Sequence, residues 1–214
     1  WMVQRDNPFF GRPLVNRYWK HFFTRGLVHP EDDMRATNPA SNPELLDALA
    51  QTFIDSGYNL KAFIRLICQS ATYQLDSHPN EVNEDDKQNF SRYYPRRLSA
   101  EEIRDSILNL TGKLNLKMGG PSIYTEVPRD VLATASRPGG AWGNSYEEDR
   151  NRRSVYIYVK RSLHEPFLSA FDWADTDNTC DVRFVTTVPT QTLTLLNSKF
   201  LNDSAESLAK RLAK

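Results

Sequence analysis

The chain has 214 residues, which is enough to bury a substantial apolar core. Its 27 lysines and arginines balance its 27 aspartates and glutamates, so no net charge draws it to nucleic acid or to an anionic membrane surface. Because of this balance, we expect no nucleic-acid partner. No apolar run reaches the length that crosses a bilayer, so we expect no membrane span in this sequence.

The first predicted helix buries a broad aromatic stripe. Its apolar residues recur one, four and five positions apart, which is the spacing of one helix face. We expect the helix to end near Gly26, because glycine readily adopts the left-handed backbone conformation that closes helices. The stripe consists of Leu14, Val15, Tyr18, Trp19, Phe22 and Phe23.

Two further helices are predicted to pair as an antiparallel hairpin. Asn42 can cap the first, with Pro43 at the first helical position and Glu44 near the positive end of the helix dipole. Gly57 can end that helix, and Asn59 can cap the second. The expected buried faces are Leu45, Leu46, Leu49, Ala50, Phe53 and Ile54, then Leu60, Phe63, Ile64, Ile67 and Ala71.

The middle of the chain carries a loop signal and then a helix signal. Residues 76–86 are acidic and nearly free of apolar side chains, so we expect an exposed loop or a disordered segment there. Ser99 and Glu102 have the spacing of a capping box at a helix start. The buried face of that helix is predicted to carry Ile103, Ile107, Leu110 and Leu114.

The second half of the chain has fewer regular signals. Residues 118–153 show no sustained period and predict a long irregular region, whereas the β-branched and aromatic run 154–159 predicts a strand. A short helix over 165–171 and a long closing helix over 189–212 complete the pattern. The sequence therefore predicts a mainly α fold, a single helical domain over residues 1–214 with long irregular loops and one or two short β-strands.

Familiar site motifs do not occur in the sequence. The histidines do not form a zinc-binding H-E-x-x-H pair, no serine lies in a G-x-S-x-G elbow, and no glycine run continues into a phosphate-binding loop. Cys68 and Cys180 lie far apart and outside any C-x-x-C pair, so each can be a buried apolar residue or half of a single disulfide. We therefore predict no metal and no cofactor for this chain. The histidines are His21, His29, His78 and His164.

One acidic loop has oxygen ligands of the kind that calcium binds. Counted from Asp175, the sixth position is Cys180 rather than glycine and the twelfth is Thr186 rather than glutamate, so an EF-hand does not fit. The preferred interpretation is a solvated acidic loop rather than an irregular calcium site. The oxygen-bearing residues of the loop are Asp172, Asp175, Asp177, Asn178 and Asp181.

Arginines and aromatic residues alternate over residues 92–97, just before the capped helix. Planar cations among aromatic rings suit single-stranded nucleic acid or a sugar platform, but the balanced charge disfavours nucleic acid. We expect some of these arginines to pair with acids of the helix such as Glu101. Arg97, Glu101, Arg104 and Asp105 are predicted to form a polar ridge, either a functional site or a ladder of ion pairs.

Short segments spread over nearly the whole chain resemble one family in their order and spacing. The sequence is similar to the uncharacterised C-terminal domain of planctomycete-type proteins that contain cytochrome c. The residues that carry the resemblance are 7–8, 15–19, 25–28, 42–47, 56–58, 70–73, 97–101, 104–105, 153–156, 171–172, 186–187, 191–193 and 196–197.

The resemblance implies a domain of unknown function at the C-terminal end of large extracytoplasmic bacterial proteins, with haem c, where present, on a separate module. It also implies a genomic association with polysaccharide use. Members commonly have Ser-His-Pro where this sequence has Ser41-Asn42-Pro43, so no role of that histidine carries over. The family's cysteine after its Phe-Asp loop matches Cys180, and Arg183 follows.

Three functional hypotheses follow from the residues and the resemblance. The first is an accessory or binding domain that recognises polysaccharide. The second is an enzyme in which two carboxylates of a shared cleft perform acid and base chemistry, one with a perturbed pKa. The third is a docking domain for the haem module or a partner subunit, through an exposed aromatic patch that includes Trp142 or Trp173. The polar site predicted for the enzyme consists of Arg97, Glu101, Arg104, Asp105, Arg153, Asp172 and Arg183.

Overall fold

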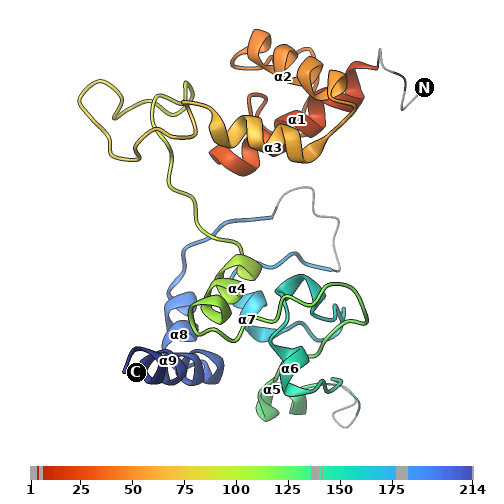
Figure 1. Cartoon of the computed structure of the whole chain (residues 1–214), viewed down its shortest axis with the longest axis vertical. Coiled ribbons are helices and arrows are strands. Elements are labelled where there is room, and N and C mark those ends of the chain that lie inside the picture. The colour runs from red at the N-terminus through yellow and green to blue at the C-terminus, as the bar shows by residue number, and fades with distance from the viewer. Residues whose placement is uncertain (1–3, 5–6, 136–139, 141, 177–182, 214) are drawn as a thin grey trace. The chain divides into compact units, whose positions relative to one another are not determined.

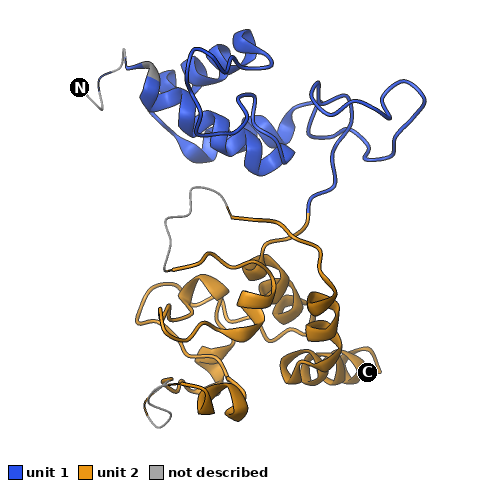
Figure 2. Ribbon diagram, turned by 180° about the vertical axis from the view of Figure 1, so that it is seen from behind, with its two compact units in different colours: residues 1–96 blue, residues 97–214 orange. Residues whose placement is uncertain are grey.

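The chain folds as two compact units, residues 1–96 (unit 1) and residues 97–214 (unit 2), as Figure 2 shows. The computed structural model describes residues 4, 7–135, 140, 142–176 and 183–213. Each unit has its own cluster of buried apolar side chains. The single domain over residues 1–214 stays a prediction.

Helices dominate both units (Figure 1). Among the described residues, β-pairing is limited to two isolated bridges, Asn115 with Arg152 and Ile123 with Ile157. The predicted mainly α fold class is therefore confirmed. Unit 1 contains α1 (Pro8–Phe23), α2 (Pro43–Asp55) and α3 (Leu60–Gln69). Unit 2 contains α4 (Ala100–Leu110), α5 (Arg129–Ala133), α6 (Glu147–Arg150), the 3₁₀ helix η2 (Ser154–Tyr156), α7 (Pro166–Ala170), α8 (Pro189–Asn197) and α9 (Lys199–Leu212).

The predicted helix starts are confirmed at side-chain level. Asn42 and Asn59 accept hydrogen bonds from the first turns of α2 and α3, at 2.9 and 3.1 Å. Ser99 forms the complete capping box of α4, in which the Glu102 carboxylate accepts a hydrogen bond from the Ser99 N–H at 2.8 Å. These caps depend on residues three positions apart, which is why the sequence alone predicts them.

The first helix ends at Phe23, two residues before Arg25, close to the predicted end at Arg25-Gly26, but a different residue closes it. Thr24, rather than Gly26, takes the left-handed conformation, with φ of 66°. Gly26 is needed for a different reason, since a Cβ there would lie 2.4 Å from the Val28 carbonyl oxygen and 2.9 Å from the Asn16 amide. The Asn16 side-chain amide is fully buried. It donates a hydrogen bond to the Val28 carbonyl oxygen and accepts one from the Val28 N–H, each at 2.9 Å.

The predicted strand over residues 154–159 does not form. Ser154–Tyr156 is a 3₁₀ turn, and only Ile157 pairs, in its bridge with Ile123. Asp105 causes the turn, because its Oδ1 accepts both the N–H and the hydroxyl of Ser154, at 2.7 and 2.6 Å. High β-propensity therefore yields no strand where a side chain captures the backbone.

Two helices of unit 2 differ from their predictions. Leu110, expected on the buried face of α4, is 60 % exposed, whereas Arg104 of the same helix is buried. The closing helix is interrupted at Ser198, whose extended backbone separates α8 from α9.

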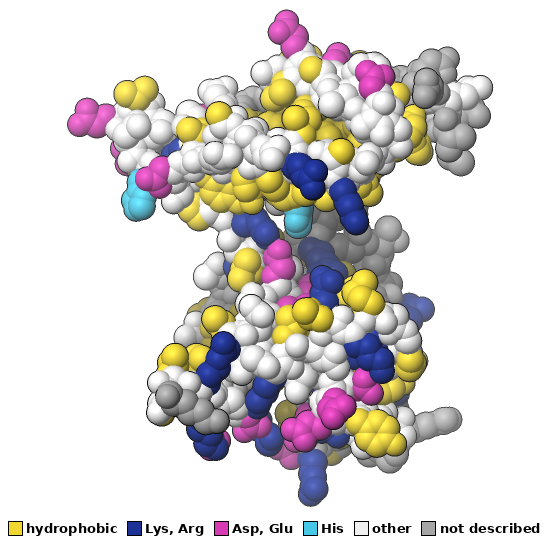
Figure 3. All heavy atoms as spheres, viewed as in Figure 1, with side chains coloured by type: hydrophobic (Ala, Val, Ile, Leu, Met, Phe, Trp, Pro, Cys, Tyr) yellow, Lys and Arg dark blue, Asp and Glu magenta, His cyan; other side chains and the backbone are white. Residues whose placement is uncertain are grey.

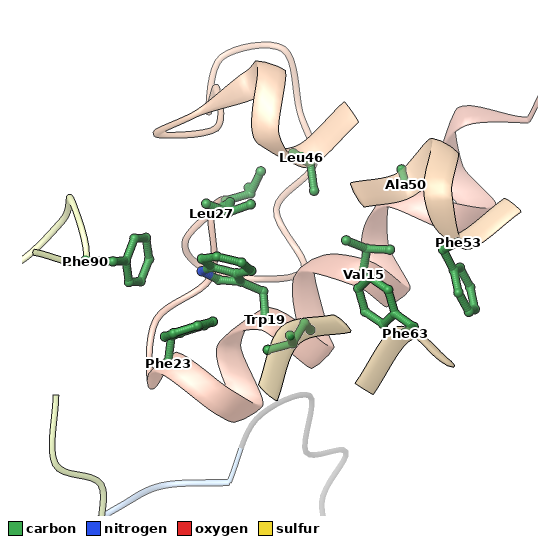
Figure 4. Close-up of a cluster of buried hydrophobic side chains, with 11 residues drawn as sticks. Val15, Trp19, Phe23, Leu27, Leu46, Ala50, Phe53, Phe63 and Phe90 are labelled. Carbon is green, nitrogen blue, oxygen red and sulfur yellow. The ribbon is translucent and has the colours of Figure 1, made fainter. Parts of the chain in front are cut away.

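Unit 1 is built around packed aromatic rings, as Figure 4 shows. Trp19 lies 4.2 Å from Phe23 and 5.4 Å from Phe90, measured between ring centroids. Phe90 belongs to the loop between α3 and α4, and its side chain is only 7 % exposed. Asp86 holds that loop in place by accepting the N–H groups of Gln88, Asn89 and Ser91 at 2.8 to 3.0 Å.

We predict that Phe90→Ala lowers the free energy of unfolding by about 3–5 kcal/mol, because it removes a ring from a packed core. Urea unfolding of the 214-residue chain measures the change. Phe184→Ala is the matched control, since Phe184 is 82 % exposed and its loss should change stability little. Similar losses from both variants would show that Phe90 does not anchor its loop.

Candidate functional site

Unit 2 contains a cavity of about 1080 Å³. Its wall is formed by α4, α6, α8 and α9, by the start of α7, and by residues 125–128. A cavity of this size is slightly larger than most small-molecule sites in proteins.

Four buried polar side chains line this cavity, namely Arg104, Thr125, Glu165 and Ser204. Each is at most 9 % exposed. Burying polar groups is unfavourable unless partners satisfy them, so the presence of four buried polar residues in its lining distinguishes this cavity. We take it as the candidate site.

Arg104 donates hydrogen bonds to carbonyl and hydroxyl oxygens, and the Asp105 carboxylate lies 3.8 Å from its Nη1. Its Nη1 donates to Arg152 O at 3.1 Å and to Ser154 Oγ at 3.2 Å, and its Nη2 donates to Arg150 O at 2.6 Å. The guanidinium lies 5.6 Å from the centroid of the Phe200 ring. Burial lowers the pKa of Arg104, which Glu165 and Asp105 partly oppose, but an arginine stays charged at any physiological pH.

Glu165 is the other charged residue among the four buried polar residues that line the cavity. Its Oε2 accepts the N–H of Leu168 at 2.6 Å, so it caps α7. Burial raises the pKa of Glu165, and the backbone N–H of Leu168 and the charge of Arg104 only partly counteract this effect. Glu165 and Arg104 thus attract each other through space without a direct ion pair.

The polar site predicted from the sequence divides into three clusters in unit 2. In the first, Arg97 pairs with Asp172 at 2.5 Å. Asp172 also accepts the N–H and the hydroxyl of Thr186, each at 2.8 Å, and Arg97 donates to the Thr186 carbonyl oxygen. Burial alone would raise the pKa of Asp172, but the bonds from Thr186 and Arg97 outweigh it and lower the pKa.

The other two clusters are also ion pairs. Arg183 Nη1 lies 2.8 Å from both carboxylate oxygens of Glu101. Asp105 lies 3.8 Å from Arg104 and 3.9 Å from Arg153, in addition to its bonds with Ser154.

Of the seven residues predicted for the site, only Arg104 lines the cavity. Their carboxylates are occupied by arginines, hydroxyls and backbone N–H groups that join distant segments of unit 2. The structure favours the ion-pair interpretation of the polar ridge over a shared cleft, and a direct role of these residues toward a ligand stays a prediction.

Sequence reasoning missed Glu165, Thr125 and Ser204. Glu165 precedes Pro166, which marks it as a possible helix cap but not as a buried residue. Thr125 and Ser204 carry no local signal, because their burial depends on segments far away in the chain.

No group of three or more histidine, cysteine, aspartate or glutamate side chains is placed to hold a metal ion within the described parts of the chain. Asp177, Asn178 and Asp181 of the considered calcium loop lie outside the described residues, as does Cys180 of the considered disulfide. Over the same described parts, no helix combines the length and the apolar character that a bilayer crossing requires.

The two tryptophans of the docking hypothesis are both half-buried. Trp142 Nε1 donates to the Thr125 carbonyl oxygen at 2.9 Å, and Trp173 packs edge-on against His164 at 5.8 Å. Both therefore have structural partners, and their role in docking stays a prediction.

Charges of both signs are mixed on one face of unit 2. On the face drawn in Figure 3, lysine and arginine side chains lie among aspartates and glutamates rather than in a separate region. The surface view is thus consistent with the balanced composition.

The comparison with family models gives a match over residues 1–214, to PSD1, described as a protein of unknown function (DUF1553). The chain belongs to the PSD1 family. No curated protein and no solved structure matches this PSD1 chain. The family assignment agrees with the predicted domain of unknown function, while the proposed cytochrome context lies beyond it.

We predict that Asp172→Asn destabilises the chain by about 2 kcal/mol near neutral pH, because it weakens charge-assisted hydrogen bonds. Asparagine tolerates the left-handed backbone at this position, where φ is 61°, so the variant tests the charge. The folded-state pKa of Asp172 is lowered, so its stabilisation is present above the unfolded pKa of about 3.9 and is lost as the pH falls through the folded value.

Thermal unfolding of both proteins from about pH 7 to about pH 3 measures this effect, and the difference in Tm should shrink as the pH falls. Asp130→Asn is the control, since Asp130 is exposed on α5. A difference that stayed constant across this range would contradict the assigned role of the Asp172 charge.

Proposed function

We propose that this chain is an accessory, ligand-binding domain of an extracytoplasmic protein, and that the cavity of unit 2 binds an uncharged segment of a polysaccharide. The observation that carries the proposal is the cavity itself, with four buried polar side chains on its wall. Buried polar groups around a pocket fix the orientation of a ligand and provide specificity.

The charges around the cavity favour an uncharged ligand. Positive and negative side chains occur there in equal number, so neither an anion nor a cation gains from a net field. Lys199, for example, lies 2.7 Å from Asp203 and 3.5 Å from Glu126. The charged lining residues are Arg104, Lys113, Arg150 and Lys199, and Glu126, Glu147, Glu165 and Asp203.

The uncharged lining residues suit a saccharide. Amides and hydroxyls from Asn151, Asn197 and Thr190 line the cavity together with the rings of Phe167 and Phe200. A sugar ring presents hydroxyl groups at its edge and C–H groups on its faces, so it can use both kinds of side chain.

Polysaccharide as the ligand, an extracytoplasmic location and a haem c module elsewhere in a longer protein rest on the family resemblance. The cavity supports only the binding of a polar organic ligand. We include these three features in the proposal as the context in which such a binding domain would work.

An enzymatic role is the second candidate, supported by one observation. Glu165 is a buried carboxyl group with a raised pKa in a cavity that other carboxylates also line. A carboxyl in such a setting can donate a proton to a leaving oxygen. Its use as the cap of α7 gives Glu165 a structural role as well, which is why we rank binding first.

The proposal predicts binding of neutral oligosaccharides by the 214-residue chain. Isothermal titration calorimetry with cellohexaose, xylohexaose and mannohexaose measures the affinities, and analysis of the same samples for shorter products tests hydrolysis. Thr190→Trp should weaken binding at least about tenfold, because the larger side chain fills part of the cavity.

Leu195→Trp is the matched control, because Leu195 is exposed on the same helix and does not line the cavity. Binding that Thr190→Trp leaves unchanged, or the absence of binding to all three sugars, would refute the proposed function. Release of shorter products would favour the enzymatic candidate.

A further inference from the structure

Arg104 has hydrogen-bonding capacity that the protein does not use. A guanidinium group carries five N–H donors, and the described residues supply three hydrogen-bond acceptors, the oxygens of Arg150, Arg152 and Ser154, while the Asp105 carboxylate lies 3.8 Å from Nη1. The side chain is nevertheless buried and lines the cavity. Its remaining N–H groups are available to a ligand there.

Thr125 provides a second buried group with unused capacity. Its Oγ1 is buried without a hydrogen-bond partner of acceptable geometry, although the hydroxyl lies close enough to Glu165 to lower the pKa of that carboxyl. The indole N–H of Trp142 holds the Thr125 carbonyl oxygen at 2.9 Å, which fixes the backbone. A buried hydroxyl without a partner costs free energy that a ligand hydroxyl can recover.

Arg104 and Glu165 bring opposite charges to the lining of the cavity, and these charges determine which ligand group can bind both side chains. An anion would be attracted by Arg104 and repelled by Glu165, and a cation would meet the reverse. A hydroxyl group avoids this conflict, because it accepts a hydrogen bond from Arg104 and donates one to a carboxylate at the same time. Chains of hydrogen bonds of this kind strengthen one another.

We infer that Arg104, Thr125 and Glu165 form a subsite for two neighbouring hydroxyl groups of an uncharged ligand. One hydroxyl accepts from the free N–H groups of Arg104 and donates to Glu165. Its neighbour exchanges a hydrogen bond with the Thr125 hydroxyl. This assignment rests on the proposed function and deepens it, since it names a vicinal diol as the group that unit 2 recognises.

The inference is tested by nuclear magnetic resonance on the 214-residue chain, with methyl β-D-glucoside as the probe. The glucoside should cause saturable shifts of the Arg104 Nε–H and of the Leu168 amide, whose N–H is bound to Glu165. The fully O-methylated glucoside has no hydroxyl donors and should cause neither shift. Glucuronate should bind more weakly than the glucoside, because its carboxylate meets Glu165.

Two variants remove single groups from the subsite. Thr125→Val keeps the shape and loses the hydroxyl, and Glu165→Gln keeps an oxygen that can cap α7 and loses the charge. Each should weaken glucoside binding by about threefold or more, the effect of one hydrogen bond. Thr134→Val and Glu84→Gln are the matched controls, since both residues are exposed and neither lines the cavity.

Circular dichroism melting shows whether each variant is folded, and Thr125→Val alone decides if Glu165→Gln unfolds. The subsite is refuted if the glucoside causes no shift at Arg104, or if Thr125→Val binds like the wild type. Retained hexasaccharide binding that Thr190→Trp blocks would then leave the proposed function standing. If neither the glucoside nor the hexasaccharides bind, both the subsite and the proposed function are refuted.

Discussion

The hydrogen bonds of the buried Arg104 guanidinium are the interaction on which the fold of unit 2 depends. It joins α4 to three oxygens of residues 150–154, so the irregular half of the unit is attached to its best-capped helix. Arg152 repeats the arrangement, donating to the carbonyl oxygens of Lys117, Gly119 and Pro121 while its guanidinium stacks 3.9 Å from the centroid of the Tyr156 ring. The guanidinium groups of these arginines thus donate hydrogen bonds to backbone carbonyl oxygens that in a β-sheet would accept them from a neighbouring strand.

This way of fixing loops has a consequence for the cavity. The hydrogen bonds of the Arg104 guanidinium go to neutral oxygens, and the Asp105 carboxylate lies 3.8 Å away, so Arg104 remains a charged group. Arg104 therefore brings a positive charge to the cavity wall, and Glu165, at the start of α7, contributes a negative charge that attracts it. The same contact that stabilises the fold makes the wall polar, so its structural and binding roles are compatible.

The sequence predicted correctly those features of the fold that depend on interactions between residues close together in the chain. The helix caps at Asn42, Asn59 and Ser99 and the aromatic face with Trp19 depend on residues within a few positions, and the structure confirms them. The prediction of a strand over residues 154–159 was wrong, because the backbone at Ser154 is bound by Asp105, which lies 49 positions away in the sequence. A pattern read along the chain contains no information on such a partner.

The same limit explains why the predicted polar site and the cavity differ. Arg104 was placed on a polar ridge because helical spacing groups it with Glu101 and Asp105, whereas its oxygen acceptors are 46 to 50 positions distant. The carboxylates that the sequence singled out are those that arginines already hold, at Glu101, Asp105 and Asp172. Within the described residues Glu165 forms no ion pair, and such a group is better able to receive a hydroxyl from a ligand, because no existing ion pair has to be broken.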